Sequence, residues 1–194
     1  MGEDLRQDTL LFQRQISDLN FVISSADSVV LLLKQKARSE HDQRRLYYLT
    51  RGITPRIRGL YMNDRTFEEM RSSGTLRLIR HKNVSDSISK YYFNVKELSY
   101  LNGIAIDRTQ RKMELEAKIF DAAVYSSMIG KDKFLIKPPS GKPMLMSGDP
   151  ETINEFGITL HYISSWCVFS KQILAQLDDK ANRLLALLEK EYPK

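Results

Sequence analysis

Three stretches of this chain repeat apolar residues at alternating steps of three and four, and this recurrence limits the fold more than any other feature. The first stripe runs from Leu5 to Ala37, the second from Val84 to Met128 and the third from Ile153 to Leu188. Such steps place side chains on one face of an α-helix, so each stripe predicts a long helix with one buried face. We therefore predict an all-α fold, an elongated antiparallel bundle of three to four long helices.

Glycine and proline positions set approximate bounds for these helices. We expect long helices over about 4–51, 84–129 and 150–192, with a short helical pair over about 64–82 at one end of the bundle. Nine glycines and six prolines are few for 194 residues, which argues against an all-β chain. A chain of this length can bury one substantial core, so the expected organisation is a single domain over 1–194.

Capping patterns refine the start and end of the shorter helices. Ser39 and Asp42 have the spacing of a capping box, so a break or kink near residue 39 is expected and would supply a fourth helix. Thr66 and Glu69 repeat this spacing in the short helical pair, where Gly74 takes the position that follows a helix C-terminus.

The second and third long helices carry signals of their own. Asn83 is expected to cap the second helix, Gly103 to bend it and Gly130 to end it. Asp149, followed by proline, is expected to cap the third helix.

The segment 130–149 reads as the one long loop. It contains three prolines and four lysines. Apolar runs at 134–136 and 144–146 flank the prolines, so a small hairpin between them and an irregular loop held by apolar side chains are the two alternatives.

Positive charge is concentrated in the middle third of the chain. The net charge is +6, yet the segment 34–82 alone has thirteen Lys and Arg against five Asp and Glu, a net charge of +8. Such an asymmetry predicts an anionic partner. The alternative is an ordinary solvated basic surface.

Residue types that usually hold metals or perform catalysis are sparse. The single cysteine, Cys167, falls on the third apolar stripe, which indicates a buried structural thiol. His41, His81 and His161 are scattered without metal-ligand spacing, and His161 reads as a histidine at the edge of the core. No phosphate loop or nucleophile motif is present. We therefore predict no metal site, no cofactor and no enzymatic activity.

Tyrosines and arginines cluster in the basic segment. Arginine binds carboxylates and phosphates with two parallel hydrogen bonds, and tyrosine adds an apolar face with a polar tip. We therefore predict a binding surface for an anionic ligand or a partner; the alternative is core tyrosines covered by arginine stems. The candidate residues are Arg56, Arg58, Tyr61, Arg77 and Arg80.

One phrase of the sequence resembles a bacterial protein family. Residues 66–79 read T-F-E-E-M-R-S-S-G-T-L-R-L-I, and a Tyr-Tyr pair follows at 91–92. This pattern resembles a family of uncharacterised membrane-anchored proteins, in which one transmembrane helix precedes a helical domain of unknown function outside the cytoplasm. The resemblance implies an extracytoplasmic, in bacteria periplasmic, location. It also implies a membrane anchor that precedes the residues of this chain.

Three functional hypotheses follow. The leading one is a non-catalytic, extracytoplasmic, sensor-like or interaction module of a membrane-anchored bacterial protein, whose partner is a protein or a small anionic ligand. The alternative is a cytoplasmic nucleic-acid-binding helical module that uses the basic segment 34–82. The third is a homo-oligomer formed by pairing the stripes of two chains. The longest apolar run, Val29 to Leu33, is shorter than the roughly eighteen residues of a membrane span, so the chain itself is expected to be soluble.

Overall fold

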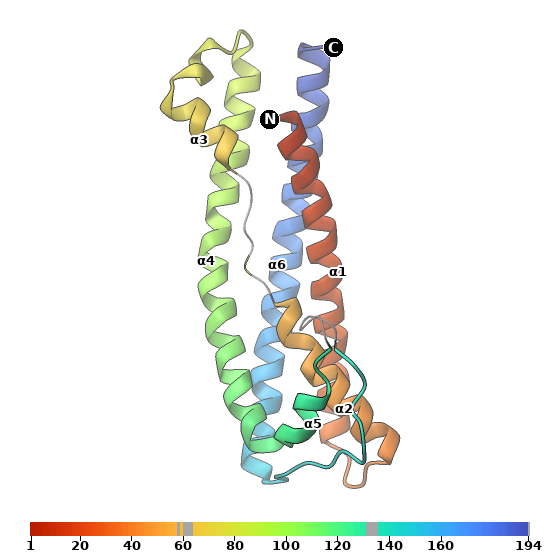
Figure 1. The fold of residues 1–194 in the computed structure, drawn as a ribbon. Helices are drawn as coiled ribbons and strands as arrows, with labels where there is room; N and C mark the ends of the chain where they lie inside the picture. Colours follow the sequence, from red (N-terminus) through yellow and green to blue (C-terminus); the bar gives the residue numbers. More distant parts are fainter. Residues whose placement is uncertain (58, 60–63, 131–135, 194) are drawn as a thin grey trace. The chain divides into compact units, whose positions relative to one another are not determined.

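The structure is a computed structural model that describes residues 1–57, 59, 64–130 and 136–193, without the side chains of residues 97, 99 and 100. These residues contain helices and two isolated β-bridges but no strand, so the all-α prediction is confirmed. The elements in chain order, shown in Figure 1, are α1 (Gly2–Leu33), α2 (Glu40–Ile53), η1 (Thr54–Arg56), α3 (Arg65–Ser72), η2 (Thr75–Leu78), α4 (Lys82–Ile119), α5 (Ala122–Ser127) and α6 (Pro150–Glu191).

The chain divides into two compact units. The first unit comprises Met1–Ser17, Gly59–Gly103 and Ser170–Lys194, and the second comprises Asp18–Arg58 and Ile104–Phe169. The helices α1, α4 and α6 each contribute residues to both units. A single domain over 1–194 therefore stays a prediction, as does the elongated arrangement of the bundle.

Buried aromatic rings organise the first unit. The Tyr91 hydroxyl of α4 donates a hydrogen bond of 2.8 Å to Asp8 of α1, and both side chains are buried. The ring of Phe67 in α3 stacks on Tyr92, with ring centroids 4.5 Å apart. Stacked and edge-to-face aromatic pairs stabilise by about 0.5–1.5 kcal/mol beyond the burial of their area. The short helix α3 is therefore held against α4 through Phe67.

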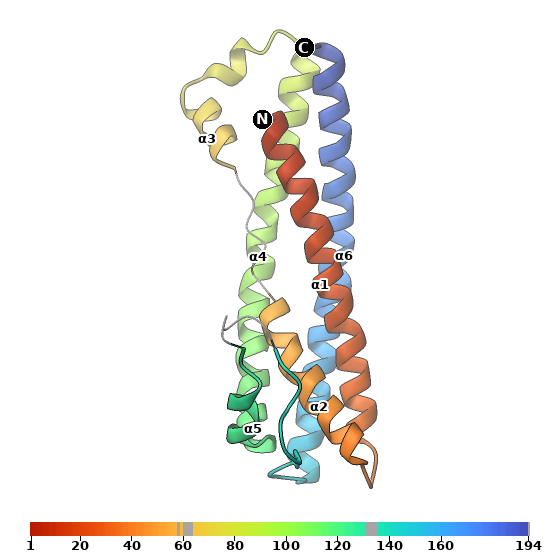
Figure 2. The ribbon, with the colours of Figure 1, turned by 45° about the vertical axis from the view of Figure 1, so that its right-hand side comes forward.

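Antiparallel helix pairs build the second unit. Arg56 lies beside Asp18 and Phe21, while Arg45 donates to Ser28, so α2 returns along α1. The same unit contains the first part of α6 and the end of α4 (Figures 1 and 2). Its aromatic core joins Tyr47 to Phe120 at 4.9 Å and Phe120 to Phe156 at 6.0 Å between ring centroids.

The predicted helical run over 4–51 consists of two helices, because α1 ends at Leu33 and α2 begins at Glu40. The Arg38 guanidinium donates to the backbone carbonyls of Leu32 and Leu33, which satisfies two of the acceptors left open at the end of α1. Ser39 and Asp42 form the predicted capping box, with the Asp42 amide donating to the Ser39 hydroxyl at 3.1 Å. The expected break near residue 39 is confirmed.

The short helical pair forms, but with a different start. The helix α3 begins at Arg65 after Asp64, so the predicted Thr66–Glu69 capping box is wrong. Gly74 follows the C-cap residue Ser73 with φ of 73°, a left-handed conformation that glycine adopts without steric cost, as predicted. The helix α4 begins at Lys82, one residue before the expected cap Asn83.

The predicted helix over 84–129 is also wrong as a single element. The helix α4 continues through Gly103 and ends at Ile119, and a separate helix α5 follows. Asp121 causes the restart, because its carboxylate accepts from the Ala123 and Val124 amides at 2.7 and 3.2 Å.

The loop before α6 follows the irregular alternative in its described part. Ile136 pairs with Ile129, and Leu145 pairs with Phe120, so neither residue pairs as the predicted hairpin requires. Residues 131–135 lie outside the described part of the chain. The helix α6 begins at Pro150 with Asp149 accepting from the Thr152 amide at 2.9 Å, which confirms the predicted cap.

One helix in the described part of the chain, α1, is long and apolar enough to cross a membrane. An 18-residue window within Gly2–Leu33 has a mean hydropathy of 1.5. The length of the unbroken run Val29–Leu33 does not reveal this property, because polar residues such as Asp18, Asn20 and Asp27 interrupt the apolar residues of α1. A core helix of a soluble protein passes the same test, and 39% of this window is buried by the protein itself.

Candidate functional site

A buried lysine lies at the centre of the second unit. Lys112 of α4 is fully buried, and it forms an ion pair with Glu116, one helical turn further along. Its ammonium also donates 3.0 Å hydrogen bonds to the Thr50 carbonyl oxygen and the Thr54 hydroxyl. All three ammonium protons therefore have acceptors. The hydrogen bond to Thr50 links α4 to the end of α2.

Aromatic groups surround this ion pair. The Tyr125 hydroxyl donates to the Glu116 carboxylate at 3.2 Å, and the Arg51 guanidinium lies 5.2 Å from the Tyr125 ring centroid. Burial lowers the pKa of Lys112 and raises that of Tyr125 well above its ordinary value, because both charged forms lose hydration. Because the Lys112 ammonium is buried and finds all its acceptors within the protein, we interpret the pair as structural.

Sequence reasoning missed this pair because both residues are charged. The predicted stripe of the second helix is correct from Val84 to Ala105. Beyond Thr109 the stripe continues, by two steps of four, through the apolar residues Met113 and Ala117 and predicts both inside. Both are exposed, whereas Lys112, Leu115, Glu116 and Ile119 are buried. The spacing of Lys112 and Glu116 was a usable signal, since opposite charges four residues apart interact on a helix.

Of the five predicted site residues, Arg56 makes its contacts with residues of the second unit. Its guanidinium lies 3.9 Å from the Phe21 ring centroid and donates to the Gly52 carbonyl oxygen at 2.9 Å. A Cβ on Gly52 would lie 3.0 Å from the Phe21 ring, so glycine permits this close packing. Arg56 therefore matches the alternative of an arginine packed over an aromatic residue.

The other four predicted residues lie either in the first unit or outside the described residues. Arg77 and Arg80 belong to the first unit, where both are exposed. Arg58 and Tyr61 lie outside the described residues. The five-residue surface therefore stays a prediction.

Many cations of the basic segment 34–82 bind groups of the protein itself. Arg44 pairs with Glu40 and donates to the Pro139 carbonyl oxygen, while Arg65 pairs with Glu69. Arg71 pairs with Glu68. These contacts orient the guanidinium groups toward internal acceptors, which leaves fewer of them for a phosphate backbone.

A groove in the second unit brings His161 together with three cations of the basic segment 34–82. It has a volume of about 1110 Å³ and lies between the end of α1 and the first turns of α6. Its basic lining residues are Lys34, Lys36, Arg38 and His161, and no Asp or Glu belongs to its lining. The lysines fall within the predicted basic segment, but His161, which is exposed, comes from a separate helix.

The floor of this groove is apolar. Val30 and Leu33 of α1 and Ile153 and Ile158 of α6 all line it, and Gly157 lies between the two isoleucines in sequence. Ile158 is 48% exposed, although isoleucine is usually buried. The groove therefore combines an apolar floor with a positively charged edge.

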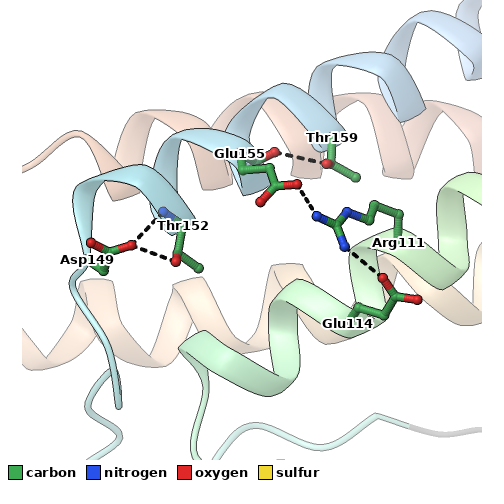
Figure 3. Close-up of polar contacts among 6 residues, drawn as sticks. All are labelled: Arg111, Glu114, Asp149, Thr152, Glu155 and Thr159. Carbon is green, nitrogen blue, oxygen red and sulfur yellow. Dashed lines mark hydrogen bonds and ion pairs between the residues drawn. The ribbon is translucent and has the colours of Figure 1, made fainter.

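Polar contacts fix the first turns of α6 beside this groove. Figure 3 shows Arg111 of α4 bridging Glu114 of its own helix, at 2.8 Å, and Glu155 of α6. The pKa of Glu114 is held below its ordinary value by the Arg111 guanidinium. At the start of α6 the Asp149 carboxylate accepts from the Thr152 amide and hydroxyl, which lowers the pKa of Asp149.

The described residues contain no group of three or more His, Cys, Asp and Glu side chains suited to a metal ion. Cys167 is buried as predicted, and burial raises the pKa of its thiol to about 12. A thiol in this environment stays protonated at neutral pH and is a poor nucleophile.

Comparison of the chain with models of protein families, with curated proteins and with solved structures finds no match. The resemblance to membrane-anchored bacterial proteins therefore stays a prediction based on residues 66–79 and 91–92.

Proposed function

We propose that this chain is a non-catalytic, sensor-like or interaction module that binds an anionic partner or ligand through the groove of its second unit. The observation that carries the proposal is the lining of that groove, four basic side chains and no acidic one above an apolar floor. Charge of one sign beside an apolar surface favours a partner that offers both properties.

The proposal extends to the location of the protein. The resemblance implies a membrane-anchored protein with its helical part outside the cytoplasm, and the apolar character of α1 is compatible with membrane association. A fusion of the natural gene product to alkaline phosphatase, an enzyme active only outside the bacterial cytoplasm, tests this part. Active reporter in the membrane fraction is the expected result, and inactive reporter with the full-length fusion present contradicts it.

Ligand binding is tested by thermal unfolding in a panel of anionic metabolites, carboxylate amphiphiles and acidic peptides. A ligand that binds only the folded state raises the midpoint, by a free energy of about 2.7 kcal/mol at a hundred times its dissociation constant. The double variant Lys34→Glu/Lys36→Glu should lose that shift, because both lysines line the groove. Unchanged midpoints for the parent across the whole panel contradict the proposal.

The nucleic-acid alternative makes a different prediction. Its basic segment contributes Lys34, Lys36 and Arg38 to the groove, whereas other arginines of the segment bind carboxylates and carbonyls of the chain. Duplex or single-stranded DNA bound through that segment would dissociate steeply with added salt. Absence of DNA binding at low salt removes this alternative and leaves the interaction module in place.

A further inference from the structure

We propose that the groove of the second unit binds one monomeric anionic amphiphile, an alkyl carboxylate of the fatty-acid class. Its chain would lie on the apolar floor, and its carboxylate would lie beside Lys34 and Lys36. The inference rests on the proposed function and names the ligand class for the same groove.

The first observation concerns Gly157. Glycine inside a helix costs about 1 kcal/mol relative to alanine, and α6 is a helix of 42 residues. A Cβ built on Gly157 would meet nothing within 4 Å, so no neighbouring side chain requires glycine there. Gly157 instead lines the groove, and the missing side chain leaves open space over its floor.

The second observation is the extent of the apolar surface. The groove follows α6 from Pro150 to Tyr162, roughly 18 Å at 1.5 Å per residue. Val30, Leu33, Ile153 and Ile158 line it, and the half-exposed Tyr162 ring borders it. A smaller cavity shares Val30, Gly157 and His161 with the groove and is also lined by Leu31, Leu160 and the acidic Asp27. This length and character match an extended alkyl chain better than a compact polar metabolite.

The third observation is the charge at one end of the groove. Lys34 and Lys36 are exposed and follow the last turn of α1, whose open carbonyls would repel an anion. Arg38 offsets this repulsion, because its guanidinium binds the carbonyl oxygens of Leu32, Leu33 and Gln35. The end of the groove therefore attracts a carboxylate despite its place beside a helix C-terminus.

Calorimetric titration of the whole chain with monomeric dodecanoate tests the proposal, with dodecyltrimethylammonium as the probe of opposite charge and the same tail. We expect saturable binding of one dodecanoate, and binding of the ammonium probe weaker by about tenfold or more, equivalent to 1.4 kcal/mol. Lys34→Glu/Lys36→Glu should remove this preference. Equal affinity for the two probes overturns the proposed role of the lysines.

The variant Gly157→Leu tests the floor. A leucine side chain would occupy the space over Gly157 and should weaken dodecanoate binding by about tenfold or more. Gly103→Leu is the matched control, because Gly103 is a helical glycine of α4 with nothing within 4 Å of an added Cβ and lies outside the groove. Circular dichroism verifies that both variants fold. Unchanged binding in folded Gly157→Leu overturns the proposal.

Two further measurements distinguish a free fatty acid from a lipid membrane, and the fatty-acid proposal from the more general proposal of a binding module. Binding to vesicles of anionic lipid without binding of monomeric dodecanoate overturns the proposal in favour of a membrane surface. Stabilisation by an acidic peptide without binding of dodecanoate overturns the fatty-acid class but leaves the binding module intact.

Discussion

At the scale of single residues, the least expected feature is the pair Lys112–Glu116 in the core of the second unit. Removing a charged pair from water costs several kcal/mol per ion, and hydrogen bonds must offset that cost. Here the Thr50 carbonyl oxygen, the Thr54 hydroxyl and the Tyr125 hydroxyl supply these bonds. The pair therefore stabilises the fold only while both members are present.

The variant Lys112→Met keeps the length of the side chain but leaves the Glu116 carboxylate buried without its counter-charge. We expect a loss of about 3–5 kcal/mol in the free energy of unfolding. The double variant Lys112→Met/Glu116→Gln should be more stable than Lys112→Met, with a coupling energy of about 1–3 kcal/mol. Urea unfolding of the four proteins of this cycle measures it, and strictly additive losses would contradict the interpretation.

At the scale of elements, the connection between α1 and α2 depends on local capping. Ser39 satisfies the Asp42 amide at the start of α2, and Arg38 satisfies carbonyls at the end of α1. The six residues 34–39 between Leu33 and Glu40 therefore need few distant contacts to form the turn.

Ser39→Ala removes the side-chain cap of α2 and should lower the free energy of unfolding by about 1 kcal/mol, while Ser39→Gly should cost only a few tenths. Ser24→Ala is the matched control, because the exposed Ser24 hydroxyl only bonds the Phe21 carbonyl oxygen within α1. Equal effects of Ser39→Ala and Ser24→Ala in urea unfolding would show that the capping box contributes nothing.

Two helical glycines have no packing role in the described structure. A Cβ on either Gly103 in α4 or Gly157 in α6 would meet nothing within 4 Å. Each change to alanine should therefore raise the free energy of unfolding by about 1 kcal/mol. Thermal unfolding of the two single variants checks this result, and destabilisation by Gly157→Ala would mean that the groove cannot hold even a methyl group.

At the scale of the whole molecule, buried tyrosines determine the response to alkaline pH. Burial raises the pKa of Tyr47 and Tyr125 in the second unit and of Tyr91 and Tyr92 in the first. Above the ordinary tyrosine pKa near 10, the unfolded chain releases these protons while the folded chain keeps them. Stability is therefore retained below about pH 10 and falls as the pH rises further. The lowered pKa of Lys112 makes the free energy of unfolding rise with pH instead, but this is one residue, whereas four tyrosines have the opposite effect.

Tyr91→Phe removes one of these titrating groups. The fall in the free energy of unfolding above pH 10 should become shallower by about 1.4 kcal/mol per pH unit. At neutral pH the variant should be less stable, because the hydrogen bond to the buried Asp8 is lost. Urea midpoints measured from pH 8 to pH 11 test both effects, and parallel curves for the variant and the parent would contradict the first.

The sequence by itself determined the all-α class, the stripe of α6, the helix break near Ser39 and the caps at Gly74 and Asp149. These features depend on contacts within a few residues or on apolar periodicity, which a linear sequence displays directly. The tertiary structure alone decided that Lys112 and Glu116 are inside, because their burial requires the backbone of α2 as acceptor. It also decided that Lys34 and Lys36 line the same groove as Gly157, since more than 100 residues separate these positions along the chain and only packing brings the end of α1 to α6.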